Sequence, residues 1–238
     1  MKHFKSVILT LSIPMLLTGC FSSSISKDKY ISKIDSAETM VNVDSPKIDD
    51  VNIHDKLSIE LYNYKVGEFY SFRYFALALI VPISYGTYTW KENGKYYHAK
   101  KELTKDLVTT EITEQQFNEY MESHRVTISE KLKEPLRNVK SIINGNSEVY
   151  TLKTAKYTSS MFSKDYKATL NSVYYEYDSA SDSQVEREMV HTLTINNNLP
   201  KSYTSKEKKD GGSDNKWTYS YGKAKFTNPN GDSSSVNQ

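Results

Sequence analysis

Apolar residues recur at helical spacing in one long segment near the middle of the chain. Thr113, with Gln116 three residues later, forms a capping box in front of the segment, and Gly145 is a suitable helix stop behind it. The residues at helical spacing are Phe117, Tyr120, Met121, His124, Ile128 and Leu132, and Leu136, Val139 and Ile143 continue the pattern beyond Pro135. The pattern predicts a long helix that is interrupted at Pro135.

Alternating apolar and polar residues dominate the rest of the chain and predict strands. Asn93-Gly94 lies between two aromatic-rich runs and predicts a two-residue hairpin with Trp90 opposite Tyr97. A first strand is expected around Ile59, and further strands at 147–158, 168–178, 185–196, 199–206 and 216–226. Consecutive strands with one or two helices predict an α+β fold, a curved antiparallel sheet of half-barrel-like meander type.

The most apolar stretch after residue 20 is Phe69–Ile83, which is too short to span a bilayer. Two interpretations remain open for it. It is either a buried structural element or the lining of a site for an apolar ligand. On the second interpretation, the candidate lining residues of such a site are Phe75, Leu77, Leu79, Val81, Trp90 and Leu193.

The N-terminus has the pattern of a secretory signal. Lys2 and Lys5 precede an apolar run that ends in Leu17-Thr18-Gly19-Cys20, and Cys20 is the only cysteine in the chain. These four residues resemble the lipobox of bacterial lipoproteins. The resemblance implies that the signal, residues 1–19, is cut off and that Cys20 carries fatty acyl groups, which would anchor the protein stably to a membrane.

The lipobox also implies a location and an organisation. The protein would lie in the cell envelope, on the outer membrane if the cell has two membranes and otherwise on the outer face of its single membrane. Residues 20–50 are polar and predict a flexible tether that contains one short helix around Ile31–Met40. A single domain is expected over 51–227, followed by a disordered tail over 228–238.

Composition changes this picture little. The formal charge of +2 falls to 0 when Lys2 and Lys5 leave with the signal, which argues against a nucleic-acid partner. The chain has 19 tyrosines, and tyrosine favours strands with half-exposed faces. An aromatic surface that binds a glycan or a peptide is the alternative reading of the same count.

The C-terminal third carries a second resemblance. The strand, Leu-Pro turn and returning strand over 192–203, followed by Trp217-Thr218-Tyr219-Ser220-Tyr221-Gly222 and then Pro229, are similar to the end of the LolA-like lipoprotein-carrier superfamily. In that superfamily a curved antiparallel sheet folds around helices and encloses an apolar cavity for acyl chains. The resemblance implies a lipid-binding half-barrel.

Motifs for catalysis or metal binding are absent from the sequence. It has no G-x-S-x-G, no glycine-rich phosphate loop and no H-E-x-x-H, and its histidines have no ligand spacing. His124 and His191 fall on apolar faces and are expected to be hydrogen-bonded core residues. We therefore expect no enzyme activity, catalytic residue, metal or cofactor. Two functions remain open: a lipoprotein that holds a lipid, and an envelope lipoprotein that presents a Tyr-rich surface to a protein or glycan partner.

Overall fold

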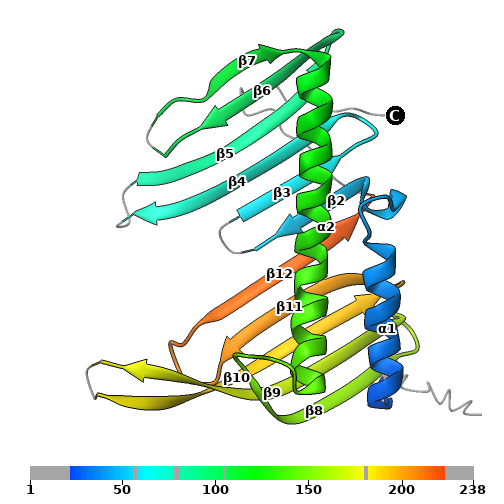
Figure 1. Cartoon of the computed structure of the whole chain (residues 1–238), viewed down its shortest axis with the longest axis vertical. Coiled ribbons are helices and arrows are strands. Elements are labelled where there is room, and N and C mark those ends of the chain that lie inside the picture. Colours follow the sequence, from blue (N-terminus) through cyan, green and yellow to red (C-terminus); the bar gives the residue numbers. More distant parts are fainter. Residues whose placement is uncertain (1–21, 56–57, 78–80, 104, 180–181, 223–238) are drawn as a thin grey trace, which may run out of the picture.

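The computed structural model describes residues 22–55, 58–77, 81–103, 105–179 and 182–222, and within residues 74–84 it describes the backbone alone. These residues form one open antiparallel sheet of twelve strands with two helices, which confirms the predicted α+β class. The strand order is β1-β8-β9-β10-β11-β12-β2-β3-β4-β5-β6-β7 (Figure 1). The predicted lipobox at Leu17–Cys20 and the predicted tail at 228–238 lie outside the described residues.

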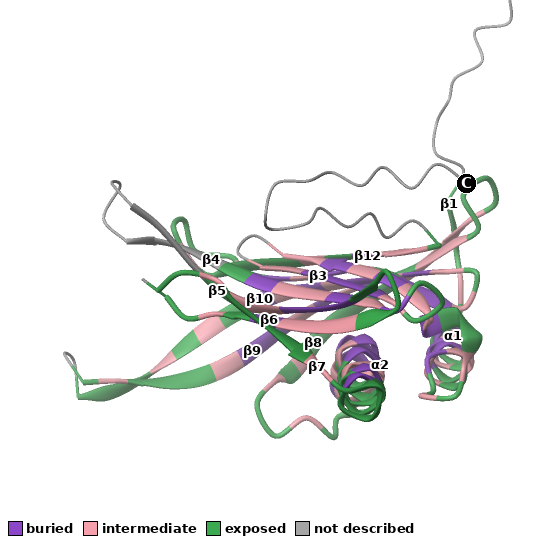
Figure 2. Cartoon of the chain, turned by 90° about the horizontal axis from the view of Figure 1, so that it is seen from above, coloured by how far each residue is buried: buried purple, intermediate pink, exposed green. Residues whose placement is uncertain are grey.

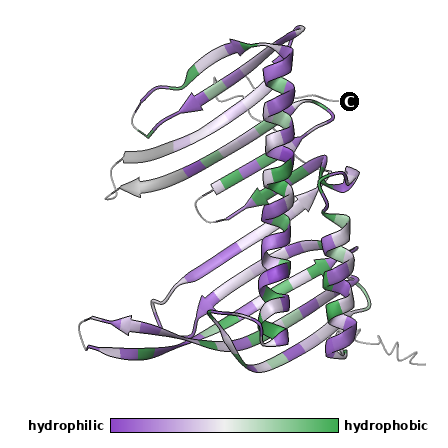
Figure 3. Ribbon diagram, in the orientation of Figure 1, coloured by the Kyte–Doolittle hydropathy of each residue, from purple (hydrophilic) through white to green (hydrophobic). Residues whose placement is uncertain are grey.

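The strands in chain order are β1 (Ser22–Ser24), β2 (Asp50–His54), β3 (Ser58–Asn63), β4 (Glu68–Leu77), β5 (Val81–Glu92), β6 (Lys95–Lys101), β7 (Val108–Ile112), β8 (Thr151–Ser160), β9 (Asp165–Asp178), β10 (Ser183–Asn196), β11 (Leu199–Glu207) and β12 (Asp214–Tyr221). The five strands expected in the C-terminal third correspond to β8–β12, which pair in sequence order as a meander. Hydrophobic and hydrophilic residues are interspersed along the strands (Figure 3).

The hairpin at Asn93-Gly94 is confirmed. Asn93 and Gly94 have φ values of 50° and 76°, the left-handed conformation that a tight hairpin turn requires. Strands β5 and β6 then pair in the predicted register, with Trp90 opposite Tyr97. The apolar stretch 69–83 falls on β4 and β5, which pair with each other antiparallel.

The long helix α2 (Glu114–Asn144) has both bonds of the predicted capping box, and Gly145 closes it with a φ of 72°. It differs from the prediction at Pro135, where the helix continues without interruption. Proline removes one helical hydrogen bond, but Leu136 and Val139 bury their side chains completely on the following turn. The free energy of that burial outweighs the lost bond.

Residues 22–50 are folded where a flexible tether is expected, and the short helix predicted around Ile31–Met40 is the C-terminal part of a longer helix. Residues Lys27–Met40 form helix α1, which begins at the N-cap Ser26 and buries Tyr30, Ile34 and Ala37. The Tyr30 hydroxyl donates a hydrogen bond of 2.9 Å to the carbonyl oxygen of Leu193. A short 3₁₀ helix, η1 (Pro46–Ile48), then leads into β2. The segment is polar in composition but belongs to the folded domain.

Both helices lie on the same face of the sheet, and the main core fills the space between them and the strands (Figure 2). A smaller aromatic cluster lies on the opposite face of β4, β5 and β6. Its buried members are Phe72, Tyr88, Trp90 and Ala99. The sheet therefore has aromatic packing on both faces near β5, whereas the main core lies only on the helix-covered face.

Candidate functional site

The best candidate site is a cleft of about 290 Å³ between α2 and the middle of the sheet. Strands β12 and β2 pair over only four residue pairs, from Thr218 with His54 to Tyr221 with Val51. The cleft lies where this short pairing ends. The lining residues are Ile53, Asp55, Ser58, Glu60, Arg73, Lys131, Glu134, Pro135, Asn138, Tyr203, Trp217 and Tyr219. We call this set the junction cleft.

Aromatic side chains form one wall of the junction cleft. Because side chains alternate along a strand, Trp217 and Tyr219 on β12 share the helix-covered face with Tyr203 on β11. The Trp217 and Tyr203 rings stack at 5.5 Å between centroids with 22° between their planes. Tyr203 and Tyr219 are buried, whereas Trp217 is half-buried. The wall therefore offers a ligand the indole ring of Trp217, whose position is fixed by stacking on Tyr203.

Charged side chains form the opposite wall. The Glu60 side chain, on β3, is almost fully buried and accepts hydrogen bonds from Lys131 on α2 and, at 3.3 Å, from the Ser71 hydroxyl. Both bonds go to Oε1, and the second carboxylate oxygen, Oε2, has no hydrogen-bond partner among the described residues. A buried oxygen without a donor raises the free energy of the folded state, and a donor from a ligand would remove this cost.

The turn of α2 that faces the cleft supplies further polar groups. Pro135 has no N–H, so the carbonyl oxygen of Lys131, four residues before it, loses its usual helical donor. One turn on, the Asn138 amide donates a 2.8 Å hydrogen bond to the Tyr203 hydroxyl. Lys131, Pro135 and Asn138 are four and three residues apart and therefore lie along one helix face. This face carries the carbonyl oxygen and the ammonium group of Lys131 and the side-chain amide of Asn138.

A series of buried side-chain hydrogen bonds holds Tyr203, one of the residues that line the cleft. The Tyr203 hydroxyl lies 3.0 Å from His191 Nδ1, and His191 Nε2 lies 3.0 Å from the Ser172 hydroxyl. Burial lowers the pKa of His191 to about 4, so the ring is neutral at physiological pH. This confirms His191 as a hydrogen-bonded core histidine. These hydrogen bonds fix the position of the Tyr203 ring, on which Trp217 stacks.

His124 differs from its prediction in one respect. Its ring is partly buried and stacks on Phe69 at 3.4 Å between centroids, but its Nε2 has no hydrogen-bond partner among the described residues. Burial, followed by the nearby His98, lowers the pKa of His124 to about 3. The stacking on Phe69 and the absence of charge explain why the imidazole remains buried without that bond.

Of the six predicted apolar lining residues, the structure describes the side chains of Trp90 and Leu193 and places these two on opposite faces of the sheet. Trp90 belongs to the aromatic cluster on the face away from the helices, whereas Leu193 is fully buried on the helix-covered face. Phe75 and Leu77 lie on β4 and Val81 on β5, where only the backbone is described. Leu79 and the proposed lipidation site Cys20 lie outside the described residues.

Sequence reasoning found one wall of the junction cleft and missed the other. The alternation of Trp217, Tyr219 and Tyr221 indicated an aromatic face on the last strand. Glu60 and Lys131 are 71 residues apart in sequence, and neither belongs to a recognisable motif. Only the packing of α2 against β3 brings these two side chains to the same place.

Comparisons with known proteins identify no relative: no family model, no curated protein and no solved structure matches this chain. Among the described residues, no group of three or more His, Cys, Asp or Glu side chains could hold a metal ion. Neither described helix has the length and apolar character that a bilayer-spanning helix needs. Arguments about function therefore depend on the geometry of the chain.

Proposed function

We propose that this protein is a lipid-anchored envelope lipoprotein that binds a hydroxyl-rich ligand, an envelope glycan, in the junction cleft. The anchor is the acylated Cys20, which holds the domain on the outer membrane, or on the outer face of the membrane in a cell that has only one. The protein acts by binding alone and performs no reaction on the ligand.

The observation that carries this proposal is the combination of walls in the junction cleft. Sugars present apolar C–H faces that pack on aromatic rings and hydroxyl groups that bind carboxylates, amides and cationic side chains. Trp217 offers a half-buried ring, while Glu60 and Asn138 offer fixed polar groups at its opposite wall. A few oriented polar groups beside an apolar surface are the usual composition of a small-molecule site.

Packing argues against a stored acyl chain on the helix-covered face of β8–β11. Leu170, Leu193 and Ile195 are fully buried there, as are Ile34 of α1 and Leu136 of α2. The space that a lipid carrier would leave hollow is filled by the protein's own side chains. The five best-formed clefts along the described chain also include charged side chains, and desolvating these would oppose the entry of an acyl chain.

The binding mechanism follows from the two walls. A sugar ring that stacks on Trp217 would direct hydroxyl groups toward the Glu60 carboxylate. The Glu60 carboxylate, which lines the cleft, would then accept a hydrogen bond from the ligand. Because the Tyr203 ring and the Asn138 amide already hold each other, little side-chain entropy is lost on binding.

The proposal is tested with a panel of soluble glycans, including oligomers of N-acetylglucosamine and peptidoglycan fragments. The full acylated chain in detergent is titrated with each compound, and binding is measured by calorimetry and native mass spectrometry. Trp217→Ala should weaken binding about five- to tenfold, because a stacked aromatic contact is worth on the order of 1–1.5 kcal/mol. Glu60→Gln should weaken it by a similar factor.

The matched control is Tyr175→Ala, which removes an exposed aromatic ring from β9, outside the cleft. This variant should bind as the unmodified chain does. Equal weakening by Tyr175→Ala and Trp217→Ala would contradict a site in the junction cleft. Binding of no glycan, together with a stoichiometric phospholipid bound to the purified chain, would favour the lipid-carrier interpretation instead.

A further inference from the structure

The first strand of the fold begins beside an exposed apolar turn. In β1, Ser22 pairs with Ser160, the last residue of β8. The chain then turns through Met161 and Phe162 before β9 begins at Asp165. These two side chains are 83 % and 77 % exposed, the highest exposure of any large apolar side chain in the described part of the chain. Two neighbouring apolar residues at a turn tip form a compact apolar contact surface.

The sequence places the lipid anchor next to this turn. Cys20 lies two residues before Ser22, and two residues of chain reach at most about 7 Å. An acyl chain on Cys20 would therefore hold the β8–β9 turn against the membrane surface. The opposite edge strand, β7, lies at the far end of the strand order and would be the part of the sheet most distant from the anchor.

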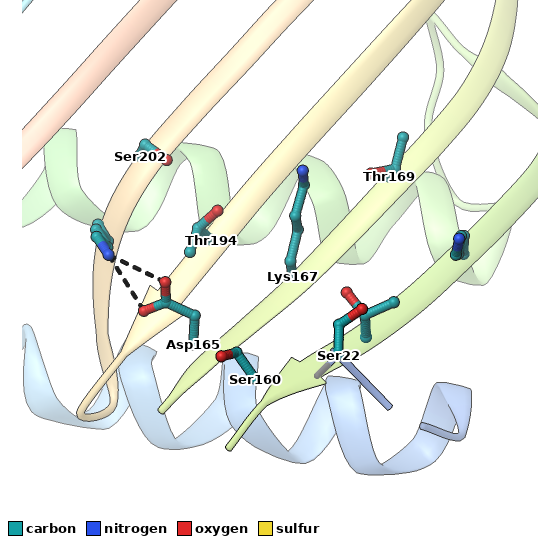
Figure 4. A pocket seen from close by; sticks show the side chains of 10 residues that line it. Ser22, Ser160, Asp165, Lys167, Thr169, Thr194 and Ser202 are labelled. Carbon is teal, nitrogen blue, oxygen red and sulfur yellow. Dashed lines mark hydrogen bonds and ion pairs between the residues drawn. The ribbon is translucent and has the colours of Figure 1, made fainter. Parts of the chain in front are cut away.

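Positively charged side chains line a groove next to the β8–β9 turn. On the sheet face away from the helices, a groove beside β1 is lined by Lys156, Lys167 and Lys201 together with hydroxyl side chains and one acid, Asp165 (Figure 4). Three lysines and one aspartate leave a net charge of +2, although Lys201 is paired with Asp165 at 3.0 Å. The groove therefore complements anionic phospholipid headgroups in charge.

We propose that the β8–β9 turn is a second membrane contact, in which Met161 and Phe162 enter the headgroup layer and the lysines of the groove contact anionic phospholipid. This inference depends on the proposed acylation of Cys20. Apolar residues at the interface and neighbouring cations are the two contributions that hold peripheral proteins on anionic membranes. With the acyl anchor they would fix the orientation of the domain, so that the β7 edge points away from the membrane.

The test uses the natural lack of other thiols. With Cys20 acylated, Met161→Cys provides a single reactive thiol for a polarity-sensitive fluorophore. The labelled full chain is reconstituted into phosphatidylcholine vesicles with or without phosphatidylglycerol, and quenching by spin-labelled lipids is measured. Val108→Cys is the matched control, because Val108 is also apolar and 63 % exposed but lies on β7.

We expect the label at 161 to shift its emission to the blue and to be quenched by spin-labelled lipids, more strongly when phosphatidylglycerol is present. The label at 108 should show neither effect. Lys167→Glu in the Met161→Cys chain should remove the dependence on phosphatidylglycerol. If the label at 161 reports water as the label at 108 does, the membrane contact is overturned and the lipid anchor stands. If mass spectrometry finds no acyl group on Cys20, the anchor itself is overturned.

Discussion

The two halves of the sheet are covered differently by the same pair of helices. Strands β10 and β11 pack against both α1 and α2, and β9 packs against α1, whereas the helix that packs against β3–β6 is mainly α2. In the first half the buried side chains are mostly aliphatic, such as Leu170, Leu193 and Ile195. In the second half α2 packs through rings, with Phe117 beside Tyr96 and His124 stacked on Phe69.

The difference shows how one sheet can be stabilised in two ways. Two helices bury enough aliphatic surface that the outer face of β9 and β10 can stay polar, with Thr169 and Thr194 pointing away from the helices. The half without α1 adds the cluster of Phe72, Tyr88, Trp90 and Ala99 on its outer face. The junction cleft lies between the two halves of the sheet, where the β12–β2 pairing is short. Its polar side chains are not packed into the apolar core of either half.

The largest expected effect comes from breaking the half with two helices. Ile34 is fully buried in α1, and Ile34→Ala should lower the free energy of unfolding by about 3 kcal/mol through lost burial and a residual cavity. Hydrogen exchange should show lower protection in β9 and β10, with β5 and β6 little changed until global unfolding. The control Val126→Ala, at a 44 % exposed position of α2, should change stability by less than about 0.5 kcal/mol. Equal loss of protection in both halves would contradict the comparison.

Acid should weaken both halves, since each contains one buried neutral histidine. Burial lowers the pKa of His191 to about 4 and that of His124 to about 3, both below the value of 6.5 for an unperturbed histidine. The unfolded chain therefore binds more protons, and stability is lost as the pH falls from about 6.5 toward 3–4, on the order of 3 kcal/mol for each residue.

The pH effect is measured by urea denaturation between pH 8 and pH 4. His124→Phe keeps a ring against Phe69 and removes one titrating group, so its stability should fall less steeply with acid than that of the unmodified chain. His191→Gln should also reduce the slope, while lowering stability at neutral pH through the altered bonds to Tyr203 and Ser172. An unchanged slope in both variants would exclude these histidines as the cause.

A smaller effect is expected at the start of α2, which lies over the half without α1. The Thr113 side chain accepts a hydrogen bond from the Gln116 amide and closes the capping box. Thr113→Ala should lower the free energy of unfolding by about 1 kcal/mol. Thr127→Ala is the control, because Thr127 is exposed in the helix interior and bonds only to the Ser123 carbonyl, a contact of little value to the helix. A loss in Thr127→Ala as large as in Thr113→Ala would argue against the cap.

Local signals in the sequence predicted the local structure well. The turn at Asn93-Gly94 and the capping box at Thr113 each act within a few residues, so the hairpin and α2 could be predicted. Helix α1 was predicted only in part, as a short helix around Ile31–Met40. Tyr30, Ile34, Ala37 and Val41 recur at helical spacing, but the many Ser, Lys and Asp residues around them are also typical of a tether.

The junction cleft could not be predicted, because its residues meet only through long-range pairing. Strand β2 begins at Asp50 and its partner β12 ends at Tyr221, and no local pattern specifies that these strands are neighbours. Pro135 was read as an interruption of the helix, whereas in the structure it lines the cleft. Trp90 and Leu193, two of the side chains expected to form a lipid site, lie on opposite faces of the sheet, because strand neighbours could not be assigned from periodicity alone.

The most direct test of the central claim uses the two tryptophans, of which Trp217 lines the junction cleft and Trp90 lies in the outer aromatic cluster. The Trp90→Phe and Trp217→Phe chains each keep one indole, and the fluorescence of each is followed during titration with the tightest-binding glycan of the panel. The account predicts a saturable change in emission from Trp217 in the first chain and none from Trp90 in the second. A change from Trp90 with none from Trp217 would place the ligand elsewhere and contradict the junction cleft as its site.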